Sequence, residues 1–132
     1  MKSIPASHHD LLEAATRAFA FIATVMPDGS PQVTPVWFDA DDEHILINTA
    51  EGRVKDKNMR RRPRVALCLM DTSDPYRYLQ IRGHVVERTY DGADAHIDRL
   101  SRKYHGRPWV PHPGQKRVLY KIRPEKTDVR HR

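Results

Sequence analysis

The stretch FAFIATVMPDGSPQVTPVWFD, residues 19–39, decides the fold class of this chain. Two strand-like runs, residues 18–26 and 31–39, flank a four-residue segment, residues 27–30, that contains an Asp-Gly pair. Apolar and β-branched runs on either side of a short Asp-Gly turn are the pattern of a β-hairpin. We therefore expect two antiparallel strands here.

Further strands and helices are predicted on both sides of this hairpin. Residues 76–90 read as a long strand in which Leu79 and Ile81 share one face, and Gly83 indicates a bulge or a close backbone approach. A helix over residues 91–106 is expected to be capped by Asp91 and closed by Gly106. The remaining predicted elements are strands at 44–50, 64–71 and 115–130, a helix at 8–17 capped by Asp10, and a helix at 52–62 that ends before Pro63.

The order of these elements is β-β-β-α-β-β-α-β. Hairpins without alternating β-α crossovers predict a mainly β protein, an antiparallel barrel with attached helices, rather than a parallel dinucleotide-binding sheet. The chain has no GxGxxG motif, no Walker loop and no internal repeat. Its 132 residues predict one domain, residues 1–132.

Several classes of protein and site are excluded by what the sequence lacks. It has no apolar run of 18 residues and no basic-then-apolar leader, so we expect neither a membrane span nor a signal peptide. Cys68 is the single cysteine, and a cytoplasmic protein is expected. The eight histidines form no HxxxH or HExxH pattern, which predicts no metal site, and the absence of GxSxG argues against a serine hydrolase.

Positive charge is concentrated in two stretches. Residues 51–64 and 115–132 each carry seven basic and two acidic groups, a net +5 each, while the whole chain carries +6, so the rest sums to −4. Two positive patches on a mildly acidic body indicate anion sites. Nucleic acid is a possible anion for the RRRPR run, residues 60–64, but no known nucleic-acid-binding module matches the element order, so no nucleic-acid partner is predicted.

The first of these stretches begins with a turn, TAEGR at residues 49–53, that leads from a strand into a helix. Lys55 and Asn58 lie three apart and hence on one face of that helix. A helix start flanked by Lys and Arg suits a phosphate. The arginines that follow have two interpretations, a solvated helix face or a groove for a longer anion, and the charge pattern leaves both open.

At this point the chain resembles a known family. Residues 19–39, 48–67 and 78–85, in this order and spacing, resemble the flavin-reductase-like split β-barrel family related to pyridoxamine 5'-phosphate oxidases. More narrowly, they are similar to its branch that uses the deazaflavin coenzyme F-420. The resemblance covers nearly the whole chain, residues 19–129.

The resemblance implies an FMN-binding split barrel that forms a homodimer, with two cofactor clefts at the subunit interface. It implies cofactor-binding residues on two strands, at the start of a helix, at one further strand position and in a loop contributed by the partner subunit. In that order these residues are Thr34, Pro35, Val36 and Trp37; Asn48, Thr49 and Ala50; Arg53, Lys55 and Asn58; Gln80; and Trp109 with His112. Trp37 on its own suits barrel core as well as contact with a ring.

The implied function is a reductase that transfers a hydride from reduced coenzyme F-420 to a small, conjugated unsaturated or carbonyl substrate. The glutamate tail of this cofactor would lie in a groove of Arg60, Arg61 and Arg62. The first alternative is an FMN-dependent oxidoreductase of the pyridoxamine-phosphate-oxidase type. The chain is shorter than those oxidases and lacks their C-terminal arginine and histidine pattern. The second alternative is a flavin- or haem-related binding module without turnover.

Overall fold

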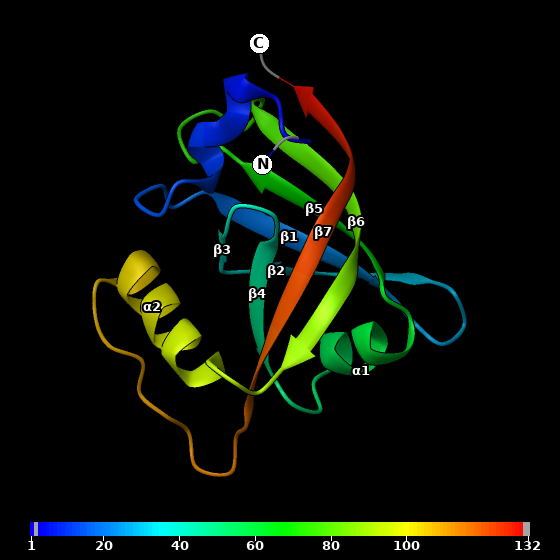
Figure 1. Cartoon of the computed structure of the whole chain (residues 1–132), viewed down its shortest axis with the longest axis vertical. Helices are drawn as coiled ribbons and strands as arrows, with labels where there is room; N and C mark the ends of the chain where they lie inside the picture. Colours follow the sequence, from blue (N-terminus) through cyan, green and yellow to red (C-terminus); the bar gives the residue numbers. More distant parts are fainter. Residues whose placement is uncertain (2, 131–132) are drawn as a thin grey trace.

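The computed structural model describes residues 1 and 3–130 and consists mainly of one curled antiparallel sheet (Figure 1). The strand order is β2-β1-β5-β6-β7-β4-β3, and every neighbouring pair is antiparallel. The strands are β1 Phe19–Val25, β2 Pro31–Val36, β3 Phe38–Ala40, β4 Ile45–Ala50, β5 Arg64–Met70, β6 Tyr78–Thr89 and β7 Arg117–Arg130; the helices are η1 Ala6–Leu12, α1 Val54–Arg61 and α2 Ala93–His105. The predicted mainly β, antiparallel split-barrel fold is confirmed.

The hairpin on which the prediction rested is β1 and β2. Their register runs from Ala20 opposite Val36 to Val25 opposite Pro31. The turn between them has Gly29 at φ 87°, a left-handed conformation that glycine adopts without steric cost. The Asp-Gly pair therefore forms the hairpin turn that the sequence predicts.

Trp37 divides the second predicted strand into two strands that lie at opposite edges of the sheet. β2 pairs with β1, whereas β3 pairs with β4. The two edges of the curled sheet are thus separated by one residue along the chain, and this residue is the corner at which the barrel closes. The single run predicted at residues 31–39 was wrong in this respect, because its two halves bond to different partners.

The core fills the inside of the curl. Alternate residues of each strand point inward, so Ile22, Leu67, Ile81 and Tyr120 are fully buried. Each large apolar side chain of this kind contributes about 1.5–3 kcal/mol when buried. The face of β6 predicted to be apolar, with Leu79 and Ile81, is the buried one.

β4 is buried on both faces, so that Asn48 on this strand is buried as well. Ile45 and Ile47 belong to the main core, whereas Leu46 packs with Ala93 of α2 in a second, smaller cluster. Helix α2 packs on β4 and β7, as Figure 1 shows beside these strands. Asn48 lies two residues after Leu46 and therefore also faces α2.

Gly83 combines a bulge and a close approach, as the sequence predicts. The register of β6 against β7 shifts between Arg82 and Gly83. A Cβ atom at Gly83 would lie 2.2 Å from the carbonyl oxygen of Arg123. β6 can approach the backbone of β7 this closely at Gly83 because glycine has no side chain.

Two helices of the structure differ from their predictions, one in its type and the other in its N-cap residue. The N-terminal segment is a 3-10 helix over Ala6–Leu12, so Asp10 lies inside it and is not its cap; the Asp10 carboxylate instead accepts a hydrogen bond from Arg77, at 2.6 Å. Helix α2 has Gly92, not Asp91, at its N-cap, while Gly106 closes it as predicted. Within residues 1 and 3–130, no helix has both the length and the apolar character needed to cross a membrane.

Candidate functional site

A cavity of about 410 Å³ lies between the barrel corner, the start of α1 and the end of α2. Strands β1, β2, β4 and β7, helices α1 and α2, the turn before α1 and the loop before β7 all contribute to its walls. The lining residues are Phe19, Ala20, Phe21, Pro35, Val36, Trp37, Asn48, Arg53, Lys55, Ile97, Tyr104, Trp109 and Arg117. We call this cavity the cleft.

One wall of the cleft is aromatic. The rings of Trp37 and Tyr104 are nearly parallel, with centroids 5.6 Å apart, and Trp109 meets Trp37 edge-on at 6.3 Å. The hydroxyl of Tyr104 donates a hydrogen bond to the carbonyl oxygen of Ala18 at 2.9 Å. Burial raises the pKa of Tyr104 to about 12, so this hydroxyl stays neutral at physiological pH. The wall therefore offers an uncharged, flat surface to a planar ring.

Three cations lie on the cleft. They are Arg53 and Lys55 at the start of α1, and Arg117 at the start of β7. Among the described residues that line the cleft none is acidic, and within residues 1 and 3–130 none of the three forms an ion pair.

The pKa values of Lys55 and Arg117 reflect both burial and repulsion between like charges. Burial, followed by the charges of Arg53 and Arg117, lowers the pKa of Lys55. Burial and then Arg53 lower the pKa of Arg117 to about 10. Like charges brought together and partly desolvated are stabilised by an anion among them.

The turn before α1 holds the first two cations in place. Gly52 has φ 92°, and its N–H donates to Oδ2 of Asp56 at 2.9 Å. The Asp56 side chain is fully buried and also accepts hydrogen bonds from Arg88 and from the hydroxyl of Tyr120. Strands β6 and β7 thus fix the carboxylate that orients the turn, and the turn directs Lys55 toward the cleft.

A chain of buried hydrogen bonds leads from the cleft to α2. The Nε–H of Arg117 donates to Oδ1 of Asn48 at 2.8 Å. Nδ2 of Asn48 donates to the carbonyl oxygen of Ala93 at 2.9 Å and lies 3.1 Å from Nδ1 of His96. Nε2 of His96 lies 2.7 Å from Oδ1 of Asp39. The polar residue of β4 that faces α2 is therefore satisfied on every side.

Comparison with known proteins assigns the chain to a family. The sequence matches the pyridoxamine 5'-phosphate oxidase family over residues 5–131, nearly the whole chain. The chain belongs to the pyridoxamine 5'-phosphate oxidase family. It is thereby assigned to a family of split-barrel oxidoreductases that bind flavins such as FMN.

Solved structures agree with this assignment. An F420 reductase is 32% identical to the chain, with a TM-score of 0.83 over 95% of this chain and 98% of that one. A conserved hypothetical protein of Mycobacterium tuberculosis has a TM-score of 0.74 at 23% identity, over 96% of this chain and 84% of its own. HupZ of Group A Streptococcus has a TM-score of 0.69 at 21% identity, over 96% and 93% of the two chains. The last two show a shared fold.

Seven of the predicted cofactor-binding residues of this pyridoxamine 5'-phosphate oxidase family member meet in the cleft. They are Pro35, Val36, Trp37, Asn48, Arg53, Lys55 and Trp109. The loop that carries Trp109 was expected to cover the cofactor of the partner subunit, which stays a prediction. Within its own chain, Trp109 lies on the cleft against Trp37. Alternation along each strand brings some predicted residues together and turns others away.

The other six predicted cofactor-binding residues, His112 among them, do not line the cleft. Thr49 is buried on the face of β4 opposite Asn48, and Gln80 is exposed on the outer face of β6. Ala50 lines a shallow neighbouring cavity with Arg53 and His112. Thr34 also lies outside the lining. Asn58 is buried, and its Nδ2 donates to Oγ1 of Thr24 at 3.0 Å, away from the cleft.

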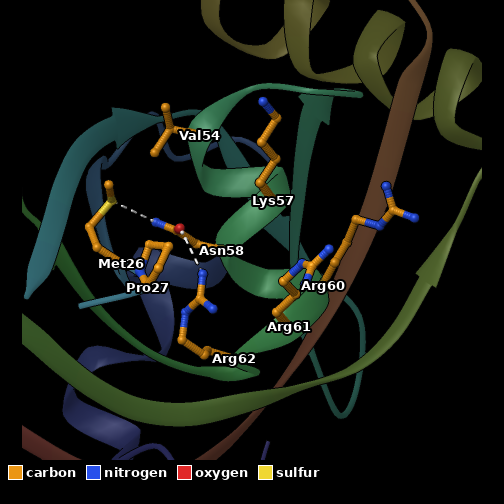
Figure 2. Close-up of a pocket in the computed structure, with 8 residues that line it drawn as sticks. All are labelled: Met26, Pro27, Val54, Lys57, Asn58, Arg60, Arg61 and Arg62. Atoms are coloured by element: carbon orange, nitrogen blue, oxygen red, sulfur yellow. Dashed lines mark hydrogen bonds between the residues drawn. The ribbon is translucent and has the colours of Figure 1, made fainter. Parts of the chain in front are cut away.

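A second cavity, of about 640 Å³, lies on the other side of the first turn of α1. Figure 2 shows its lining residues, Met26, Pro27, Val54, Lys57, Asn58, Arg60, Arg61 and Arg62. Arg60 and Arg61 are exposed. Arg62 is half-buried, with its Nε donating to the carbonyl oxygen of Val25 at 2.6 Å and Nη2 to Oδ1 of Asn58 at 3.2 Å. The arginine run is thus divided between two exposed side chains and one that ties α1 to the hairpin.

Sequence reasoning missed several residues of the cleft. Phe19, Phe21, Ile97 and Tyr104 complete its apolar walls, and Arg117 supplies the third cation. Arg117 was counted in the basic C-terminal stretch, but nothing in that stretch distinguishes it from the other basic residues. Its position opposite Ala50 in the sheet, next to the turn that carries Arg53, brings it into the site.

Proposed function

We propose that this protein is a reductase that binds the deazaflavin coenzyme F-420 in the cleft and acts on a small, conjugated unsaturated or carbonyl substrate. One observation carries the proposal: a flat aromatic wall lines the same cavity as three cations that form no ion pair within residues 1 and 3–130. Such a cavity suits a ligand with a planar ring at one end and a phosphate at the other. The likeness to an F420 reductase at 32% identity supports the choice of cofactor.

The residues of the cleft fit the two ends of this cofactor. Arg53 and Lys55 would hold the phosphate by charge-assisted hydrogen bonds. Val36, Trp37 and Trp109 would hold the ring system and exclude water from it. Reduced deazaflavin, when bound, supplies a hydride to an electron-poor carbon of the substrate. The hydroxyl of Tyr104 is committed to Ala18, so we assign the proton of the product to solvent.

We also propose that the protein works as a homodimer. The outer face of the β1-β2 hairpin is apolar and exposed, with Phe19 53%, Phe21 37% and Val33 65% accessible. Phe19 and Phe21 also line the cleft, so a partner that covers this face would close the cleft at the same time. Exposed apolar patches of this kind mark interaction sites.

The tail of coenzyme F-420 has its own candidate site. Lys57, Arg60 and Arg61 line the second cavity, which begins at Val54, the residue before Lys55. A phosphodiester held at Lys55 and extended by glutamates would reach these cations. FMN, which ends in one phosphate, would not use them. FMN nevertheless remains the second candidate cofactor, because the family match favours it.

Titration of the purified protein with coenzyme F-420 and with FMN, followed by fluorescence, tests the proposal. We expect tighter binding of F-420, and F-420-dependent reduction of an enone followed by the loss of cofactor absorbance. Tighter binding of FMN, with turnover by FMN alone, would replace the first candidate by the second. Binding of F-420 without reduction of any enone or quinone would support a binding module.

A point substitution then locates the site. Lys55→Ala is expected to weaken F-420 binding by about 1.5–3 kcal/mol, the worth of a hydrogen bond to a charged group. Lys126→Ala, at an exposed position on β7, is the matched control and should leave the affinity unchanged. Equal affinity of the Lys55→Ala variant and the parent would move the phosphate site away from α1.

A further inference from the structure

We infer that Arg117 is a third ligand of the anion in the cleft and that Asn48 is the residue that positions it. The inference rests on the proposed anion site of Arg53 and Lys55 and extends it to a strand far away in the sequence. It gives the basic C-terminal stretch a specific role at one residue.

Arg117 is buried at the cleft, and in the part of the chain that the structure describes its guanidinium is bound by neutral groups alone. The residue is 8% exposed. Its Nε donates to Oδ1 of Asn48 at 2.8 Å, Nη1 donates to Oε1 of Gln115 at 3.0 Å, and the group lies 5.1 Å from the ring centroid of Trp109. Among the described residues, Nη2 has no acceptor. A planar donor fork with one amino group unused is suited to a phosphate oxygen.

The charge of Arg117 is also uncompensated. A buried cation is normally paired, because its desolvation is costly. Arg117 has no ion pair within the described residues, and its strongest charged neighbour is Arg53, which repels it. Asp94 exerts a smaller, favourable effect. Both the unused donor and the unpaired charge of Arg117 therefore favour binding of an anion beside its guanidinium.

The amide of Asn48 can adopt one orientation alone. Its Oδ1 accepts from Arg117, while its Nδ2 donates to the carbonyl of Ala93 and to Nδ1 of His96. A flipped amide would present N–H groups to the Nε–H of Arg117 and an oxygen to the carbonyl oxygen of Ala93, two repulsive contacts. Asn48 is thus a fixed acceptor for Arg117.

His96 of α2 holds the amide of Asn48 in this orientation. Its Nδ1 accepts from Asn48, so by the hydrogen-bond network its proton is on Nε2, which faces Asp39. Asp39 is held in turn by Nε of Arg99 at 2.9 Å. The neutral character of Asn48 is essential to the inference, because a carboxylate at this position would neutralise Arg117 and compete with the ligand.

The test compares two ligands that share a ring and differ in the phosphate, FMN and riboflavin. For Arg117→Gln we expect FMN affinity to fall about 10- to 100-fold, as for a lost hydrogen bond to a charged group, and riboflavin affinity to change less than about twofold. Arg123→Gln, an exposed arginine on the same strand, is the matched control and should change neither. Equal losses for both ligands, or no loss for FMN, would overturn the role of Arg117.

A double-mutant cycle tests the role of Asn48. Asn48→Leu should weaken FMN binding in the parent but have no further effect in the Arg117→Gln background, because the two act through one contact. Asn48→Asp should weaken FMN and spare riboflavin, since the new carboxylate pairs with Arg117. Far-UV circular dichroism verifies the fold of each variant. Fully additive effects, or an Asn48→Asp variant that binds FMN as the parent does, would overturn the positioning role.

A flavin-free measurement separates this inference from the proposed function. Inorganic pyrophosphate should raise the melting temperature of the parent and raise that of Arg117→Gln less. If the parent bound no flavin or deazaflavin yet kept this difference, the proposed function would fail while the anion site remained. If pyrophosphate raised both melting temperatures equally, Arg117 would not be a ligand of the anion.

Discussion

The Nε atom of Arg88 lies 3.0 Å from Oδ1 of the fully buried carboxylate of Asp56. This contact joins the end of β6 to the first turn of α1, whose backbone the same carboxylate holds through the N–H of Gly52. Burial alone would raise the pKa of Asp56, but hydrogen bonds from Arg88, Tyr120 and Gly52 outweigh burial and lower it. The proposed phosphate site therefore rests on a buried ion pair that does not itself face the cleft.

Removing Arg88 should destabilise the fold and disturb the site. Arg88→Met leaves Asp56 buried without its cation, and we expect a loss of about 3 kcal/mol in the free energy of unfolding, the lower end for a broken buried pair because Arg88 is partly exposed. Urea unfolding measures this loss. Arg102→Met, which breaks an exposed pair with Asp98, is the control and should cost at most about 1 kcal/mol. Equal costs for the two variants would contradict the structural role of Arg88.

The same carboxylate predicts how stability depends on pH. Asp56 has a pKa below its ordinary value of 3.8 in the folded state, so its contribution is full above 3.8 and is lost as pH falls through the folded pKa. The difference in unfolding free energy between the parent and Asp56→Asn should thus be largest at neutral pH and shrink below about pH 4. Urea titrations at a series of pH values measure it. A difference that stayed constant down to the acid range would show that Asp56 is not ionised in the fold.

The second cavity predicts a distinction between the two cofactors. Replacing Arg60 and Arg61 by Ser should weaken the binding of coenzyme F-420 but leave FMN affinity unchanged, because FMN ends at the phosphate site. Arg62 is kept in this variant, since it holds Val25 and Asn58 and its loss would disturb α1. The effect should shrink with added salt, as the screening length falls from about 10 Å at 0.1 M to about 3 Å at 1 M. Unchanged F-420 binding at low salt would identify both arginines as a solvated helix face.

The apolar face of the hairpin predicts how the dimer is disrupted. Val33→Glu places a charge at the middle of this face, and we expect sedimentation at low micromolar concentration to show a shift toward the 15.3 kDa monomer. Val86→Glu, at an exposed position on β6, is the control and should leave the dimer intact. Cofactor affinity should fall together with dimerisation, because Phe19 and Phe21 border the cleft. A parent that sediments as a monomer would remove the shared-cleft proposal.

Local patterns in the sequence determined much of the fold. The Asp-Gly turn predicts the hairpin of β1 and β2 because that turn geometry depends on adjacent residues alone. Alternation places Leu79 and Ile81 inside, Gly83 marks the bulge, and Pro63 limits the helix that ends at Arg61. The position of Arg53 and Lys55 close together at the start of α1 could be predicted for the same reason, since a turn that leads into a helix is determined by residues adjacent in the sequence.

Long-range packing decided the rest, and no local pattern contains it. Asn58 was predicted to bind phosphate, yet the hairpin buries it against Thr24, and Arg62 is held by Val25. Arg117 reaches the cleft because β7 pairs with β4, and Trp37 becomes the corner of the barrel because its two neighbouring strands join opposite edges of the sheet. Periodicity specifies which face of a strand or helix a side chain takes. Which residues meet across that face depends on strand pairing between distant parts of the chain, and for this protein the tertiary structure alone supplies it.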